Sequence, residues 1–281
     1  MSQYAQPHSL AEALALRAKG DWSVLAGGTD FYPARADRPI DENVLDISRI
    51  QALKNIEEHP DHFRIGALVT WSQMIHAALP PYFDALKQAA REVGGVQIQN
   101  SGTVVGNVCN ASPAADGVPV LLALDARVEV HSHSIPAAQI ALLSWIISPK
   151  KTQISQDALV TALIIPKPQF STASAFLKTG ARKYLLISTA MVAAVLEHNN
   201  QHITQARIAV GACSPVAKRL DSLEKRLIGC NFDASICDHI LKSDFDDLSP
   251  IDDVRANAAY RLDVARTLTQ RVLQQIIGAS R

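Results

Sequence analysis

The sequence predicts a mixed α and β protein of two modest domains, and three observations support this. The chain has 281 residues, of which 48% are apolar and 19% charged, as in compact globular proteins long enough for two domains. Short apolar strands alternate with capped helices along its length. The composition turns to Pro, Gln and Ser at 166–170, so we place a boundary between domains 1–168 and 169–281.

The first domain begins with a helix at 9–19, where Ser9 and Glu12 have the spacing of a capping box and Gly20 ends the helix. Three short apolar runs then read as strands, at 22–26, 43–47 and 63–67. The charged stretch between the last two, at 57–61, reads as a turn.

Two further helices are expected before the middle of the chain. Thr70 caps the first, and the second has apolar residues every three or four positions until Gly94. After a polar stretch, 118–124 reads as an apolar helix or turn, and strands are expected at 126–131 and 159–166.

The second domain reads as strands followed by helices. Strands are expected at 173–178, 191–197 and 202–210, with a hairpin turn at 198–201, and shorter helices at 219–228 and 233–241. In the last helix Ser249 is the expected cap, Pro250 lies in the first turn, and an apolar stripe runs from Val254 to Ile276.

The stretch 97–126 is the densest in small and hydrogen-bonding residues. Gly102, Gly106 and Gly117 free the backbone for close approach, while valines and Cys109 interrupt the polar positions. Polar groups in a buried stretch need partners. Either a bound polar ligand or a tightly wound loop that bonds to itself would provide them, and spacing alone favours neither.

The strand at 22–26 runs directly into Gly27-Gly28-Thr29-Asp30. Successive backbone N–H groups at such a turn can point at a phosphate, and the threonine hydroxyl adds a donor. A simple tight turn is the alternative. The sequence contains no G-x-G-x-x-G, so a Rossmann fingerprint is excluded.

Both stretches resemble the FAD-binding subunits of molybdenum hydroxylases, a family that includes xanthine dehydrogenase, carbon monoxide dehydrogenase and nicotinate or aromatic-acid hydroxylases. The turn matches the family's A-G-G-T-[DE]. The later match comprises Asn100, Gly102, Thr103, Gly106, Asn107, Ala111, Ser112, Pro113, Asp116, Pro119, Leu122, Ala123 and Leu124. One position departs, because Val105 stands where the family has the first of paired glycines.

The resemblance extends over nearly the whole chain and implies an α+β fold: an FAD-binding region of the vanillyl-alcohol-oxidase or PCMH type, with two subdomains divided near 55–60, and a C-terminal α/β domain of the CO dehydrogenase flavoprotein type. It implies that the glycine turn wraps the FAD pyrophosphate and that Lys178 bonds a ring carbonyl, although a solvated surface lysine is as consistent with the sequence. The expected cofactor-binding residues are Ala26, Gly27, Gly28, Thr29, Asp30, Thr103, Gly106, Asn107, Asn110, Ser112, Asp116 and Lys178.

The resemblance also implies a relay function. Electrons would come from a large molybdenum-cofactor subunit through a small iron–sulfur subunit to FAD, and pass to an acceptor such as NAD. Two other functions remain open. One alternative is an assembly subunit that has lost FAD, for which Val105 is the argument. The other is a free-standing flavin reductase, against which the C-terminal match speaks.

Composition excludes other function classes. Lys plus Arg and Asp plus Glu are both 27, so no net field attracts nucleic acid or an anionic membrane. No signal peptide or run of roughly 18 apolar residues occurs. A C-x-x-C pair is missing, so we expect no metal site and reduced cytoplasmic thiols at Cys109, Cys213, Cys230 and Cys237.

Overall fold

The structure is a computed structural model that describes residues 2–36, 38–180 and 187–279. Its N-terminal lobe is a small parallel sheet in the order β1-β3-β2, built from β1 (Tyr4–Ala5), β2 (Ser23–Leu25) and β3 (Val44–Asp46). Helix α1 (Leu10–Arg17) connects the first two strands, and the Ser9 hydroxyl accepts from the Glu12 N–H at 3.2 Å, as its sequence predicts. Short 3₁₀ helices follow at Pro33–Arg35 and Gln51–Leu53.

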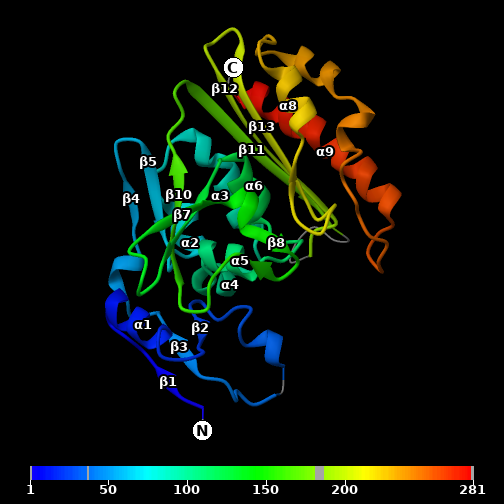
Figure 1. The fold of residues 1–281 in the computed structure, drawn as a ribbon. Coiled ribbons are helices and arrows are strands. Elements are labelled where there is room, and N and C mark those ends of the chain that lie inside the picture. Colours follow the sequence, from blue (N-terminus) through cyan, green and yellow to red (C-terminus); the bar gives the residue numbers. More distant parts are fainter. Residues whose placement is uncertain (1, 37, 181–186, 280–281) are drawn as a thin grey trace.

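A five-stranded antiparallel sheet forms the centre of the first domain (Figure 1). Its strands, in the order β4-β5-β10-β6-β7, are Ile56–Glu58, His62–Gly66, Leu159–Pro166, Arg127–His131 and Ala138–Ala141. The central strand β10 is buried from Leu159 to Ile165, which explains why its sequence is apolar except at Thr161. Strand β4 occupies part of the expected charged turn, because Glu57 pairs with Arg64 of β5 in the ladder.

Helices pack on one face of this sheet: α2 (Trp71–His76), α3 (Asp84–Glu92), α4 (Val96–Ser101), α5 (Val104–Asn110), α6 (Gly117–Ala123) and α7 (Leu142–Trp145), with a 3₁₀ turn at Pro81–Phe83. Thr70 and Gln73 complete a capping box at α2. Of the two alternatives for the polar stretch, the tightly wound loop is wrong as a description of 97–116, because most of these residues are helical. The Thr103 hydroxyl caps α5 by accepting from the Gly106 N–H, and left-handed Ala111 ends it.

The second domain is a four-stranded antiparallel sheet of β11 (Ser171–Thr179), β12 (Ala190–His198), β13 (Ile203–Gly211) and β14 (Lys218–Arg219). Helices α8 (Asp221–Leu227) and α9 (Ala258–Ala279) cover one face, while α3 and α6 of the first domain lie on the other (Figure 1). Strand β12 therefore alternates between two cores. Met191, Ala193 and Val195 face the first domain, and Ala190, Val192, Ala194 and Leu196 face α9. A β8–β9 hairpin (Ile146–Ser148, Lys151–Thr152) lies beside α5.

The prediction that the last helix begins at Ser249 is wrong, because α9 begins at Ala258. The Asp253 carboxylate accepts from the N–H groups of Arg255 and Ala256 and pairs with Arg261 at 2.8 Å. Aspartate bonds of this kind compete with a helix for backbone donors. Val254 is fully exposed, so a helix there has no apolar surface to bury. The segment expected as a helix at 233–241 is instead the 3₁₀ helix Ala234–His239, and another follows at Lys242–Phe245.

Within residues 2–36, 38–180 and 187–279, no helix is both long and apolar enough to cross a membrane.

Candidate functional site

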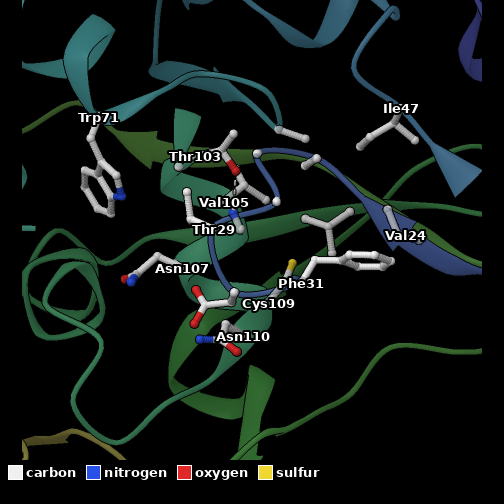
Figure 2. Close-up of a pocket in the computed structure, with 18 of the residues that line it drawn as sticks. Val24, Thr29, Phe31, Ile47, Trp71, Thr103, Val105, Asn107, Cys109 and Asn110 are labelled. Carbon is white, nitrogen blue, oxygen red and sulfur yellow. Dashed lines mark hydrogen bonds between the residues drawn. The ribbon is translucent and has the colours of Figure 1, made fainter. Parts of the chain in front are cut away.

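A cavity of about 550 Å³ lies between the N-terminal lobe and helices α4 and α5 (Figure 2). This volume falls in the range of small-molecule and cofactor sites. The structure brings to its wall nine of the expected binding residues: Ala26, Gly27, Gly28, Thr29, Asp30, Thr103, Gly106, Asn107 and Asn110. They come from a turn after β2 and from a helix some 75 residues later, so the fold alone assembles them.

The glycine turn presents free donors to the cavity. Among the described residues, none accepts a hydrogen bond from the backbone N–H groups of Gly27, Gly28, Thr29 or Asp30. Gly28 has a φ of +74°, in the left-handed region that places successive N–H groups on one side of a turn. Unpaired backbone donors at a cavity wall need a ligand or water as acceptor, so this turn suits an anion.

Gly27 is constrained by contact with the backbone. A Cβ on Gly27 would lie 2.0 Å from the Ser101 carbonyl oxygen, where α4 ends. The backbone of the turn therefore packs directly against the backbone at the end of α4. No larger residue fits without moving one of the two segments.

Asn107 lines the cavity, and a backbone donor orients its amide. Its Oδ1 accepts from the Gly117 N–H at 3.2 Å, at the beginning of α6. The amide NH₂ then faces elsewhere, and no described residue accepts from it. Figure 2 shows Asn107 on one side of the cavity and Val24, Phe31 and Ile47 on the other. The cavity thus offers both polar and apolar wall residues, as a ligand with both phosphates and rings requires.

Asp116 and Lys178 lie outside the cavity wall and bind each other. Lys178 Nζ is 2.6 Å from Asp116 Oδ2, and both side chains are only 9% exposed. Lys178 also donates to the Glu92 carbonyl oxygen, and the Ser188 hydroxyl donates to Asp116 Oδ1 at 2.6 Å. The solvated-lysine alternative is therefore wrong. Burial raises the pKa of Asp116, while Lys178 and Ser188 oppose that shift by stabilising the carboxylate.

The ion pair is nevertheless adjacent to the cavity at two points. Val93, next to the Glu92 carbonyl that Lys178 contacts, lines the cavity. Gly117, next to Asp116, bonds Asn107 of the wall. Ser112 lies in a second cavity of about 320 Å³, together with Ser188 and Arg261. Residues 181–186, which include part of the motif after Lys178, are outside the described residues.

The sequence reasoning missed the apolar lining. Val24, Phe31, Ile47, Ile154 and Val160 line the cavity from three parts of the chain, at 24–31, at 47 and at 154–160. An apolar residue at a ligand wall looks like an ordinary core residue in the sequence. The exposure of Val24 and Ile154, both 38%, distinguishes them, and this becomes visible only in the structure.

Comparison with known proteins identifies the family. Residues 1–168 match the model of the FAD binding domain in molybdopterin dehydrogenase, and residues 175–276 match the CO dehydrogenase flavoprotein C-terminal domain. The chain belongs to this family of flavoprotein subunits. The expected α+β fold, with FAD as cofactor and a C-terminal flavoprotein domain, is confirmed.

The similarity to known proteins extends over nearly the whole length of both this chain and its relatives. The xanthine dehydrogenase FAD-binding subunit of Escherichia coli O157:H7 is 28% identical, over 99% of this chain and 97% of its own. The carbon monoxide dehydrogenase medium chain of Hydrogenophaga pseudoflava is 25% identical, over 96% and 95%. The reconstituted CO dehydrogenase from Oligotropha carboxidovorans superposes with a TM-score of 0.90 at 26% identity, over 99% and 98%. The chain is thus an oxidoreductase subunit of this family.

The residues present fit FAD. The free N–H groups at Gly27–Asp30 match an acceptor-rich pyrophosphate, and the apolar wall residues offer contact surface for a ring. Val105 does not disturb the backbone, because it is the second residue of α5 and has a helical conformation. Its side chain is 2% exposed and lines the cavity, so it narrows the space rather than straining the chain.

Replacing Val105 by glycine is expected to tighten FAD binding, because it removes side-chain volume from the cavity wall. The apo protein should lose about 2 kcal/mol of unfolding free energy through lost burial and weaker helix propensity. Titration with FAD and thermal unfolding of the apo protein would measure both effects. Val104→Gly is the matched control, since Val104 is fully buried away from the cavity and its loss should lower stability alone. Weaker FAD binding by Val105→Gly would show that the valine is a needed part of the wall.

Proposed function

We propose that this chain is the electron-relay subunit of a molybdenum hydroxylase. Bound FAD supplies the exchange between single-electron and electron-pair transfer, which no amino-acid side chain provides. The observation that carries this proposal is the cavity with its row of free backbone donors at Gly27–Asp30. The protein's part is to bind and orient the cofactor.

Each group of wall residues has a distinct part in that binding. The glycine turn and Thr29 hold the pyrophosphate, and Asn107 and Asn110 donate to phosphate or ring acceptors. Lys178 lies outside the wall in this structure, and its bond to a ring carbonyl requires the one N–H that remains after its bonds to Asp116 and the Glu92 carbonyl oxygen to reach past the wall residue Val93. It remains neutralised by Asp116 at 2.6 Å, so the site can hold an ammonium group without leaving a buried charge unpaired.

The names of the relatives support the choice of partners. These are FAD-binding or medium subunits of a xanthine dehydrogenase and a carbon monoxide dehydrogenase. We propose a hetero-oligomer with a large molybdenum-cofactor subunit and a small iron–sulfur subunit, located in the cytoplasm, with NAD as the acceptor. The substrate is then chosen in the large subunit.

Purification of the tagged chain from its native host tests this proposal. The expected preparation contains two further subunits, with FAD, molybdenum and iron bound. Anaerobic NADH should bleach the flavin absorbance of this complex, whereas a quinol should not. A chain that purifies alone with FAD, free of molybdenum and iron, would contradict the relay function. Bleaching by the quinol alone would contradict the choice of NAD.

A further inference from the structure

Lys150 adopts an unfavourable backbone conformation at the tip of the β8–β9 hairpin. Its φ is +63°, in the left-handed region that glycine occupies at little cost and other residues avoid. The Lys150 N–H donates to the carbonyl oxygen of Ala111 at 2.9 Å, and Ala111 itself has a φ of +48° at the end of α5. The hairpin tip is thereby joined to the end of the helix that forms the cavity wall. Strained positions of this kind often mark functional residues.

The Lys150 side chain reaches the same helix. Its Nζ lies 2.6 Å from Oδ1 of Asn110, which lines the FAD cavity. An ammonium group only donates hydrogen bonds, so the oxygen of the amide must face it. The NH₂ group of Asn110 is consequently directed away from Lys150, and among the described residues none accepts from it.

The two asparagines of α5 are held in the same way. Asn107 and Asn110 are three positions apart and share one face of the helix. The Oδ1 of the first accepts from the Gly117 N–H, and the Oδ1 of the second accepts from Lys150. Both amides therefore offer donors, a pair suited to the phosphate or carbonyl oxygens of FAD. A free amide could present either its oxygen or its nitrogen.

We propose that Lys150 is a positioning residue for FAD, which fixes the Asn110 amide so that it donates to the cofactor. This inference rests on the FAD site described above. Lys150 does not line the cavity, so its action passes through Asn110. A glycine would relieve the strain at this position, but it would leave the amide free to rotate.

The experiment compares FAD affinity among variants of the full chain, measured by quenching of flavin fluorescence. Lys150→Met and Lys150→Gly are expected to bind FAD about three- to tenfold more weakly, the loss of one oriented hydrogen bond. Lys150→Arg should bind nearly as wild type, because a guanidinium also only donates. Lys151→Met removes the same charge from the neighbouring exposed residue and should leave affinity unchanged.

Two further measurements separate positioning from other roles. Apo Lys150→Gly should unfold at the same or a higher temperature than wild type, so weaker FAD binding cannot come from a damaged fold. In an Asn110→Ala background, Lys150→Met should have no additional effect on affinity.

Equal affinity of wild type and Lys150→Met would overturn the inference. A further loss of FAD affinity on adding Lys150→Met to Asn110→Ala would also overturn it. If that further loss disappears at high salt, the lysine acts directly through its charge. A wild-type chain that takes up no FAD would instead overturn the cofactor assignment itself.

Discussion

The Gly27→Ala variant is expected to lose most of its FAD affinity and part of its stability. The new Cβ would lie 2.0 Å from the Ser101 oxygen, 2.8 Å from the Ser101 carbonyl carbon and 3.0 Å from the Gly102 Cα. All three are backbone atoms, so no side chain can rotate away. The turn must separate from the end of α4, which displaces the free N–H groups from the cavity. Such overpacking costs about 1–3 kcal/mol of unfolding free energy, and more where backbone collides with backbone.

FAD titration and thermal unfolding would measure both losses. Gly20→Ala is the matched control in the same lobe, because its Cβ would meet only the Trp22 ring nitrogen, at an ordinary 3.6 Å. Cys109 gives an independent measure of occupancy, since this residue lines the cavity; burial raises the pKa of its thiol to about 12, so its labelling is slow and is followed as a rate at mildly alkaline pH. FAD should protect that thiol from maleimide in wild type and in Gly20→Ala but not in Gly27→Ala. Protection of Gly27→Ala at wild-type FAD concentrations would contradict the packing argument.

The Asp116→Ala variant is expected to be destabilised by about 3 kcal/mol, because it leaves the Lys178 ammonium group buried without its counter-ion. The Lys178 side chain is 9% exposed and keeps one hydrogen bond, to the Glu92 carbonyl oxygen. The destabilisation should therefore lie at the lower end of the range for a broken buried ion pair. FAD binding should also weaken by about 1–3 kcal/mol, since Asp116 precedes the Gly117 N–H that holds Asn107. Urea unfolding measures the loss of stability, and FAD titration separately measures the loss of binding free energy.

The double variant Asp116→Ala/Lys178→Met is the control for this explanation. Removing both charges should recover part of the lost stability, because no unpaired charge remains in the interior. FAD affinity should not recover, since the lysine is then missing as well. Additive destabilisation would contradict the ion-pair account. Unchanged FAD affinity with lowered stability would show that Asp116 is purely structural.

Much of the secondary structure could be predicted from the sequence alone, because it depends on interactions between neighbouring residues. The cap at Ser9, the capping box at Thr70 and the glycine turn after β2 each depend on residues within a few positions of one another. Strands β10 and β12 were predictable because short, largely apolar runs bounded by turn residues are typical of buried strands. The glycine turn and the polar stretch also indicated the family, since together they match its motifs at many specific positions.

The tertiary structure decided the rest, because the interactions concerned join distant segments. Asp116 and Lys178 are 62 residues apart, and Asn110 and Lys150 are 40 apart, so no local pattern pairs them. The stretch 97–116 has the composition of a loop but forms helices, because its valines find a core to pack against. The residues near Val254 have the pattern of a helix but form a turn, because Asp253 accepts from the backbone donors and Val254 is fully exposed. A sequence pattern shows which residues of a segment can be buried. Whether they are buried depends on a partner surface, which only the tertiary structure supplies.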